Sequence, residues 1–295
     1  MTALHKFLLI SLLLCACVLP PSALAALTRV IYPLGEVQND TRYKDAIEML
    51  CTSLEKTKAQ FGDYECKPGA AIMPKKRFLQ ELEQTNHNIN VIWNPTSEEL
   101  EQRFSAIHIS LRKDLLGYRV ALIHKDNQYK IDQIKTLNDL KKISFGQGVG
   151  WSDNAIYEFH GIQVVQAQYS QLFKMLDANR FLFLPRGVGE ILSEYDSNVK
   201  DNPNLAIEKN LLIYYPFPYY FFFNHNDKAI KDRVEIGLRL MHKDGSFDAI
   251  FNKYHQVAIE KLNLKNRRII RLENPFLPKN TPMDNATLWS SSSVK

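Results

Sequence analysis

The chain has 295 residues, of which 45% are hydrophobic and 23% are charged, with a formal net charge of +5. A chain of this length and composition can bury a sizeable core and form two domains, and it lacks the composition of a disordered protein. Its mild basic excess is spread along the chain, which argues against a nucleic-acid or membrane-surface partner. After residue 25, no apolar stretch is long enough to span a bilayer.

The first 25 residues have the features of a secretory signal peptide. Lys6 precedes a short apolar segment, Phe7–Val18, and Ser22-Ala23-Leu24-Ala25 supplies small residues where a signal peptidase reads them. We expect cleavage after Ala25 and a soluble, periplasmic mature protein. Alternatively, Leu14-Cys15-Ala16-Cys17 resembles a lipoprotein processing site, which would place a lipid on Cys17.

Two cysteines, Cys51 and Cys66, remain in the mature chain. In an oxidising compartment such a pair predicts a disulfide, and closing so short a loop stabilises the fold by about 3 kcal/mol. A metal or catalytic role is the alternative, but no Cys-x-x-Cys motif and no nearby histidine pair accompanies these cysteines.

Short apolar strands alternate with helical patterns in the first part of the chain. Residues 28–33 and 90–93 are runs typical of strands, whereas Tyr43–Lys58 has apolar residues at helical spacing. Thr96 and Glu99 are then spaced as a helix capping box. A further strand is expected at 64–66 and a further helix from Pro74. This alternation favours a largely parallel sheet covered by helices on both faces.

The pattern restarts after Arg112. A strand entered through a glycine, Leu115–Ile123, begins a second α/β series that ends in Leu211–Tyr215. Strands are expected at 143–145, 163–166 and 181–184, with helices after Ser152, Ser170 and Gly187. An aromatic strand, Tyr219–Phe223, is followed by helices to about Leu262. From Asn274 we expect an extended tail, pinned at most by Phe276 and Trp289.

Two turns of this second series follow a strand and precede a helix. Gly146-Gln147-Gly148-Val149-Gly150 leads into Trp151, Ser152 and Asp153, and Phe183-Leu184-Pro185 leads into Arg186 and Gly187. In this position, backbone N–H groups and polar side chains bind small polar or anionic groups. We therefore expect the two turns to form one wall of a ligand cleft.

Two local motifs resemble those of the family 3 extracytoplasmic solute-binding proteins, which are associated with amino-acid ABC transporters. Residues 137–146, Leu-Asn-Asp-Leu-Lys-Lys-Ile-Ser-Phe-Gly, are similar to the family's entry into its second lobe. Residues 243–254, Lys-Asp-Gly-Ser-Phe-Asp-Ala-Ile-Phe-Asn-Lys-Tyr, are similar to its C-terminal helix. The resemblance covers residues 28–262 and extends to the order of the predicted elements.

The resemblance implies an α/β, two-lobed periplasmic binding protein-like fold of type II, each lobe being a mainly parallel sheet flanked by helices. Lobe 1 would be discontinuous, with residues 26–114 and 216–273, and lobe 2 would be residues 115–215, before a tail at 274–295. The chain would cross between lobes near Arg112–Tyr118 and Tyr214–Pro218, where a hinge would close the lobes on a solute. Such a protein would be a monomer.

The sequence departs from the family where its amino-acid binders grip their ligand. Those proteins place an arginine for the α-carboxylate after a Ser/Thr-rich stretch, whereas the stretch Trp93-Asn94-Pro95-Thr96-Ser97 is followed here by Glu98 and Glu99. They place an aspartate for the α-amino group in lobe 2, where this chain has Pro185-Arg186-Gly187. The pattern therefore favours a small polar solute other than an α-amino acid, with an anionic ligand facing Arg186 as one possibility.

Each candidate contact has a structural alternative. Arg186, in the same turn as Gly187, suits bidentate binding of a carboxylate or phosphate, or else pairs with Glu190 one turn further on. Trp151 and Trp93 either stack on a ligand or cover the edge of a core.

The remaining candidates are polar. Thr96, Ser152 and Asp153 are expected first as helix caps and second as ligand contacts. Arg112, at the first crossover, reaches the cleft or else remains solvated at the surface.

Catalytic and cofactor motifs are absent from the sequence. The three glycines at 146–150 lack the spacing of a dinucleotide fingerprint, and there is no His-Glu-x-x-His or Gly-x-Ser-x-Gly. The eight histidines are scattered, so we expect no metal site and no cofactor. Ser152, Asp153 and His160 are close in sequence, but nothing else supports a triad.

The sequence thus predicts an exported solute-binding protein that changes conformation when it closes on its ligand. Its output would be read by a membrane permease, or alternatively by a membrane sensor protein. A secreted enzyme on the same fold is the third hypothesis, and the absence of an evident acid–base pair argues against it.

Overall fold

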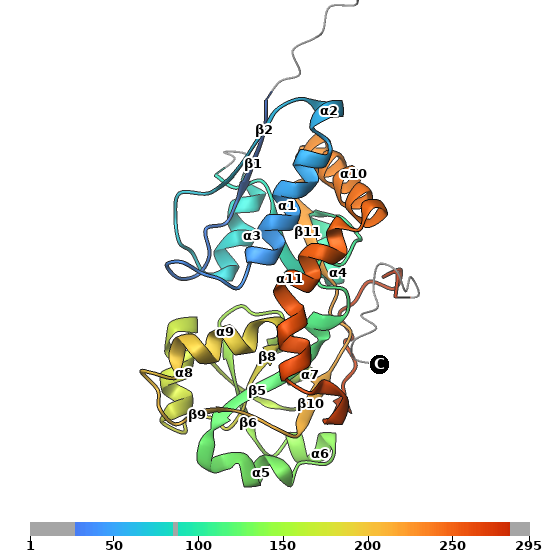
Figure 1. Cartoon of the computed structure of the whole chain (residues 1–295). Coiled ribbons are helices and arrows are strands. Elements are labelled where there is room, and N and C mark those ends of the chain that lie inside the picture. Colours follow the sequence, from blue (N-terminus) through green and yellow to red (C-terminus); the bar gives the residue numbers. More distant parts are fainter. Residues whose placement is uncertain (1–26, 85–87, 284–295) are drawn as a thin grey trace, which may run out of the picture.

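The computed structural model describes residues 27–84 and 88–283, and these form two α/β lobes stacked end to end (Figure 1). Helix α11, Ser246–Lys261, runs along one side of both lobes. Within the described residues, no helix is long and apolar enough to cross a membrane. The predicted signal peptide, Cys17 and Trp289 all lie outside the described residues.

Lobe 1 contains the first strands of the chain and the aromatic strand that returns to it. Strands β1, Thr28–Tyr32, and β2, Tyr64–Pro68, pair in parallel. Strand β11, Tyr219–Phe223, lies between β3, Ile92–Pro95, and β4, Ser105–Ala106. The helices of this lobe are α1, Lys44–Lys56, α2, Lys58–Phe61, α3, Lys75–Glu83, α4, Glu98–Arg103, and α10, Lys228–Asp244.

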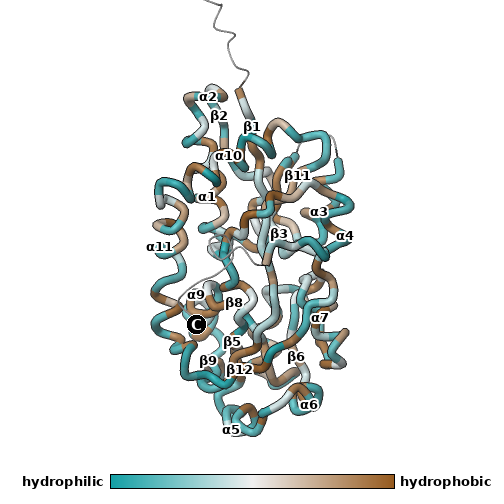
Figure 2. Tube along the Cα trace, turned by 90° about the vertical axis from the view of Figure 1, so that its right-hand side faces the viewer, coloured by the Kyte–Doolittle hydropathy of each residue, from teal (hydrophilic) through white to brown (hydrophobic). Residues whose placement is uncertain are grey.

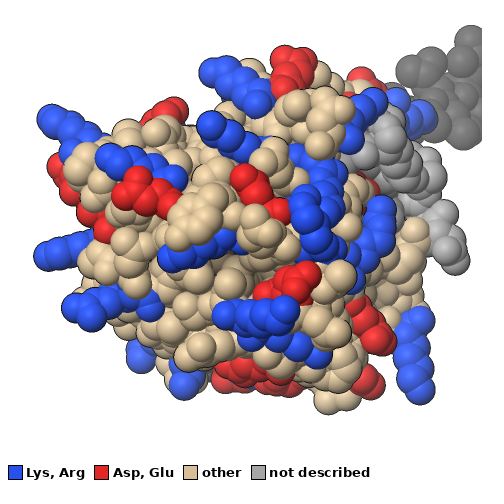
Figure 3. Space-filling view, turned by 90° about the horizontal axis from the view of Figure 1, so that it is seen from below, with Lys and Arg blue, Asp and Glu red and all other residues tan. Residues whose placement is uncertain are grey.

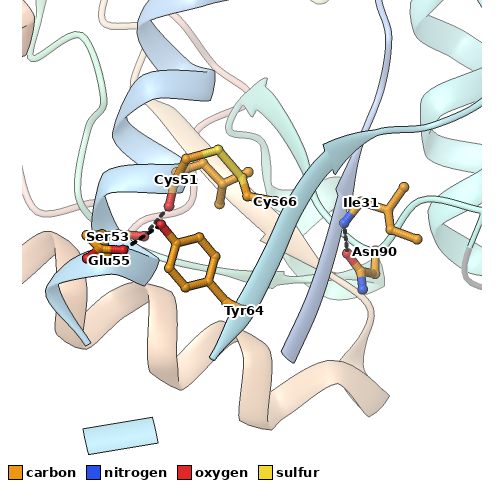
Figure 4. Close-up of a disulfide and its surroundings, with 8 residues drawn as sticks. Ile31, Cys51, Ser53, Glu55, Tyr64, Cys66 and Asn90 are labelled. Atoms are coloured by element: carbon orange, nitrogen blue, oxygen red, sulfur yellow. Dashed lines mark hydrogen bonds between the residues drawn. A yellow bond between two sulfur atoms is a disulfide. The ribbon is translucent and has the colours of Figure 1, made fainter. Parts of the chain in front are cut away.

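A disulfide between Cys51 and Cys66 ties α1 to β2, as predicted (Figure 4). Beside it, the Tyr64 hydroxyl donates a hydrogen bond of 2.8 Å to Glu55 of α1. On the other side of β2, the Ile31 N–H of β1 donates to Asn90 Oδ1 at 2.8 Å. The disulfide therefore fixes the first βαβ segment of the chain as one unit.

Lobe 2 contains a larger sheet with the order β12-β10-β5-β8, and β9 also pairs with β5. Strands β6 and β7 form a parallel pair, and a bridge between Phe145 and Phe183 joins β6 to the segment before β8. The strands are β5, Tyr118–His124, β6, Ser144–Gly148, β7, Gln163–Ala167, β8, Leu184–Gly187, β9, Leu205–Ile207, β10, Leu211–Tyr214, and β12, Arg268–Arg271. The helices are α5, Gln128–Asp132, α6, Leu137–Leu140, α7, Asp153–Phe159, α8, Tyr169–Asp177, and α9, Val188–Asn198.

The prediction of mainly parallel sheets is wrong, because both lobes are mixed. Strand β5 runs antiparallel to β8, β9 and β10, and β11 runs antiparallel to β3 and β4. Both strands come directly after a crossover, so they enter their sheets from the cleft side, opposite in direction to their neighbours. The sequence pattern predicted where these strands lie along the chain but not the direction in which they run.

The chain passes between the lobes through two adjacent segments, after β4 and after β10. Gly117 of the first segment accepts a hydrogen bond from the Tyr215 N–H of the second at 3.2 Å. A Cβ on Gly117 would lie 2.3 Å from the carbonyl oxygen of Tyr215. Only glycine therefore allows the two crossing segments to approach so closely.

The C-terminal part of the chain departs from the predicted boundary at residue 273. Strand β12 pairs in parallel with β10, so it belongs to the lobe 2 sheet and not to lobe 1. Helix α11, which precedes it, contacts α1 and α10 of lobe 1 as well as α9 of lobe 2. The lobes are consequently linked a third time.

Both lobes follow the hydrophobic pattern that the sequence predicts. Along α1 the buried face includes Ala46, Met49, Leu50 and Leu54, at helical spacing. Figure 2 shows the corresponding alternation of hydrophobic and hydrophilic residues along the outer helices α1 and α11. The face of lobe 2 that points away from lobe 1 carries both basic and acidic side chains among uncharged ones (Figure 3).

Candidate functional site

A cavity of about 450 Å³, including its open mouth, lies between the two lobes. Its wall on the lobe 1 side is formed by Arg42, Tyr43, Lys75, Asn94, Pro95 and Tyr219. The lobe 2 side and the crossing segments contribute Leu116, Arg119, Gly150, Trp151, Ser152, Asp153, Arg186, Glu190 and Phe217. Of the residues predicted from the two glycine-containing turns, Trp151, Ser152, Asp153 and Arg186 are brought together here.

The turn after β6 places Trp151 at the cavity. A Cβ on Gly148 would lie 2.2 Å from the indole of Trp151, so glycine lets the ring fold back over the turn. Gly150 has a positive φ of 77°, a conformation that side chains rarely adopt. The indole lies against the guanidinium of Arg186, 4.3 Å from the ring centre. The turn is thus built to hold an aromatic side chain beside a cation.

Arg186 is already neutralised by carboxylates of the following helix. It donates to both oxygens of Glu194, at 2.6 and 2.8 Å, and lies 3.0 Å from Glu190. Although burial lowers the pKa of Arg186, the two carboxylates raise it above its usual value. The structural alternative for Arg186, pairing with Glu190, is therefore present, and Glu194 joins it. The neighbouring Gly187 N–H donates to Glu190 at 3.3 Å instead of facing the cavity.

Arg112 is buried behind the cavity and is neither solvated nor part of the cavity wall. Its guanidinium donates to Asp45 at 2.6 and 2.9 Å and to Glu190 at 3.0 Å. His255 of α11 lies 3.0 Å from the same Asp45. Through Glu190, this cluster connects lobe 1 to Arg186 of lobe 2, so it couples the two lobes electrostatically.

The two polar residues after Trp151 do not act as helix caps, which corrects the prediction. Ser152 is the N-cap residue of α7 but makes no side-chain cap bond. Its hydroxyl accepts a hydrogen bond of 3.2 Å from Asn94 Nδ2, which joins the two lobes directly. Asp153 pairs with Arg119 at 2.8 Å and accepts a hydrogen bond from the Tyr215 hydroxyl. Both side chains are used for tertiary contacts across or beside the cavity.

The predicted capping box at Thr96 and Glu99 is also wrong. Ser97 is the N-cap of α4, and its hydroxyl accepts from the Leu100 N–H at 3.2 Å. Thr96 instead donates to Glu101 at 2.5 Å. The helix begins one residue later than predicted, because Ser97 has the extended backbone conformation that a cap requires.

Trp93 is a core residue, which was the structural alternative to ligand stacking. Its side chain has no exposed surface and packs against Tyr32, Tyr43 and Phe221. The strand nevertheless reaches the cavity, because the carbonyl oxygen of Trp93 accepts a hydrogen bond from Lys75 and the next residue, Asn94, lines the cavity. The outward-facing position is therefore Asn94.

A second chamber of about 1050 Å³, including its open mouth, adjoins the first. The two share Lys75, Asn94, Gly150, Ser152 and Phe217. Thr96 lines this second chamber, together with Leu79, Leu100, Ile156, Pro275 and Phe276. The tail therefore contributes a wall of the site, which the sequence did not predict.

Several cavity residues are not predicted by the sequence pattern, notably Arg42, Lys75, Asn94 and Arg119. Lys75 opens a helix after Pro74 and Arg119 lies in the strand after the first crossover, so each stands at a recognisable boundary. Nothing in the local sequence distinguishes these two residues from cations at the surface, because the groups that they contact are distant in sequence. Within the described part of the chain, no group of three or more His, Cys, Asp or Glu residues is arranged to hold a metal ion.

No family model and no curated protein matches the sequence. Comparison with solved structures places the fold among the two-lobed periplasmic binding proteins, which confirms the predicted fold class. An ancestral arginine-binding protein bound to arginine aligns over 78% of this chain and 99% of its own, with a TM-score of 0.57 and 18% identity.

Two natural proteins show the same likeness. An arginine-specific periplasmic binding protein of Salmonella typhimurium aligns over 77% of this chain and 99% of its own, with a TM-score of 0.57 and 14% identity. An amino acid ABC transporter substrate-binding protein from Streptococcus pneumoniae, bound to L-arginine, aligns over 77% and 94%, with a TM-score of 0.57 and 12% identity. An ancestral amino acid-binding precursor of cyclohexadienyl dehydratase also matches, at 14% identity, 77% and 95% coverage and a TM-score of 0.54. At these identities the likeness shows the fold alone.

Proposed function

We propose that the mature protein is an exported, non-catalytic solute-binding protein that closes on a small polar solute and presents it to a membrane permease. The observation that carries this proposal is a cavity between the lobes to which both lobes contribute polar side chains. Such cavities bind small molecules when a few polar groups converge in a largely preformed site. The fold supports the proposal, since its structural neighbours include amino-acid-binding proteins of ABC transporters.

The mechanism we propose is a shift between an open and a closed arrangement of the lobes. Contacts in the structure already span the cleft: Asn94 donates to Ser152, Arg112 pairs with Glu190, and the guanidinium of Arg42 lies 3.8 Å from the ring centre of Tyr169. A solute that contacts both walls lowers the free energy of the closed form only, and it shifts the population toward that form. The two crossing segments and the end of α11 are where the chain would bend.

A ligand screen tests this function. Thermal-shift measurements on the mature protein with amino acids, dicarboxylates, sugar acids, organic monocarboxylates, polyamines and short peptides should identify a solute that raises the Tm. At about 100 times Kd, such a ligand stabilises the folded protein by about 2.7 kcal/mol. If no solute in the screen raises the Tm, solute binding is contradicted.

A pair of aromatic substitutions tests the location of the binding site. Trp151→Ala removes a wall of the cavity and should weaken binding of the identified solute at least tenfold by calorimetry. Tyr129→Ala, which removes an exposed aromatic residue outside both chambers, should leave the affinity unchanged. Equal effects of the two changes would place the solute elsewhere. Loss of cellular uptake of that solute on deletion of the gene would support presentation to a permease.

A further inference from the structure

Lys75 differs from the other cations of the cavity in its surroundings. Its ammonium group donates one hydrogen bond of 2.7 Å, to the carbonyl oxygen of Trp93. It lies over the faces of Tyr43, Phe78 and Tyr219, at 5.1, 5.4 and 5.8 Å from the ring centres. Among the described ion pairs, none joins Lys75 to a carboxylate. An ammonium has three donors, so two remain for a group in the cavity.

The three arginines of the same cavity are held by carboxylates of the protein. Arg42 pairs with Glu36 and Asp40, at 2.9 and 2.6 Å. Arg119 pairs with Asp153, and Arg186 pairs with Glu190 and Glu194. A negative group on a ligand would have to compete with these partners, whereas at Lys75 it would replace only water and aromatic contacts. Among the described residues, the cavity thus offers one anion-binding position, Lys75, at the junction of the two chambers.

The chamber beyond Lys75 is suited to an apolar body. Leu79, Leu100, Ile156, Phe217, Pro275 and Phe276 line it. Its two carboxylates, Glu98 and Glu99, are exposed at the rim, and Glu99 pairs with Arg103 at 2.8 Å. A ligand whose charge lies against Lys75 can therefore place a hydrocarbon or aromatic portion among these side chains, where burial of apolar area stabilises the complex.

We propose that the solute is an organic monocarboxylic acid with an apolar body, whose carboxylate binds Lys75 and whose body fills the chamber between α3, α4, α7 and the tail. This inference rests on the proposed solute-binding function and specifies its ligand class. The carboxylate accepts hydrogen bonds from the ammonium of Lys75, and Asn94 and Ser152 lie on the shared wall beside it.

The electrostatics of Lys75 give the binding a characteristic pH dependence. Burial lowers the pKa of Lys75 to about 7, and the charges of Arg42 and Arg112 add to this effect, whereas Glu36 and Glu190 oppose it. The protonated form binds the carboxylate. Affinity is therefore higher at pH 6 than at pH 8.5, and binding at the higher pH takes up a proton.

The test uses the mature protein and one matched pair of probes, 3-phenylpropionate and its uncharged amide, 3-phenylpropionamide. Succinate serves as an acid without an apolar body. Calorimetry should show binding of the phenylpropionate at least tenfold tighter than that of either other compound. Lys75→Met should weaken phenylpropionate binding at least tenfold and remove its pH dependence. Lys76→Met, at the exposed neighbouring position of α3, should do neither.

The outcomes separate this inference from the general function. Equal binding of the acid and its amide, tighter binding of succinate, or equal effects of the two lysine substitutions would each overturn the ligand class. The same holds if none of the three probes binds while an amino acid or sugar acid from the wider screen does, and solute binding then stands. If no solute binds at all, both proposals fail. Circular dichroism of the Lys75→Met protein checks that it is folded.

Discussion

Asp45, Arg112, Arg186 and Glu190 form a buried charged cluster with Glu190 at its centre. Substitution of Glu190 is therefore expected to change the stability of the protein. Glu190 accepts a hydrogen bond from Arg112 on the lobe 1 side and pairs with Arg186 on the lobe 2 side, each at 3.0 Å. Substitution by glutamine keeps the size of the side chain and removes its charge, so two buried guanidinium groups lose part of their compensation. Breaking a buried ion pair in this way typically costs about 3–5 kcal/mol.

The expected change in Tm follows from the size of the chain. A protein of this length loses roughly 2 °C of Tm for each kcal/mol, so Glu190→Gln should lower the Tm by about 6–10 °C in calorimetry. The control is Glu235→Gln on α10, whose partners are Lys231 and Arg239 at 2.8 and 2.7 Å. Because Arg239 is 61% exposed, this pair should contribute less than about 1 kcal/mol. A decrease in Tm for Glu190→Gln no larger than that of the control would refute the role of the cluster.

The pH dependence of the Tm difference between the wild-type and Glu190→Gln proteins provides a second test. Burial acts to raise the pKa of Glu190, but Arg186 and Arg112 hold it well below its usual value. A carboxyl group with a lowered pKa in the folded state contributes stability above its unfolded pKa, about 4.3, and loses it as the pH falls further. The Tm difference between the wild-type and Glu190→Gln proteins should be constant at neutral pH and shrink below about pH 4.

Two further predictions concern lobe 1. Replacing Cys51 and Cys66 by serine opens a link between residues 15 positions apart, and should lower the free energy of unfolding in urea by about 3 kcal/mol; an unchanged value would show that the disulfide contributes no stability. Gly237→Ala places a Cβ 2.1 Å from the carbonyl oxygen of Ser53, so it should force α10 away from α1 and cost about 1–3 kcal/mol. Leu240→Ala, on the exposed side of the same helix, should cost less, and a reversed order would refute the close packing.

The sequence predicted the elements that depend on local pattern. Hydrophobic spacing indicated α1, and an aromatic apolar run indicated β11. The expected export of the chain was the basis for predicting a disulfide between Cys51 and Cys66, which the structure confirms. In the sequence, Gly117 stands at the start of a predicted strand, and in the structure it lies where the two crossing segments meet. These features are local because backbone geometry and hydrophobic spacing act over a few residues.

The sequence could not predict how the charges of the site are paired. Arg112 binds Asp45, 67 residues earlier, and Glu190, 78 residues later, so its burial depends on how the two lobes meet. For Arg186 the sequence leaves ligand binding and pairing with Glu190 both open, because its second partner, Glu194, lies two helical turns away and leaves no short-range signature. Lys75 was missed for the complementary reason, since a cation without a carboxylate partner looks like any other lysine in sequence.

The most direct test of the central claim is a crystal structure of the protein with the solute identified by the screen. We predict electron density for that solute between the lobes, in contact with Trp151 from lobe 2 and with Lys75 or Asn94 from lobe 1. Density confined to the surface of one lobe, with no contact across the cleft, would contradict the account.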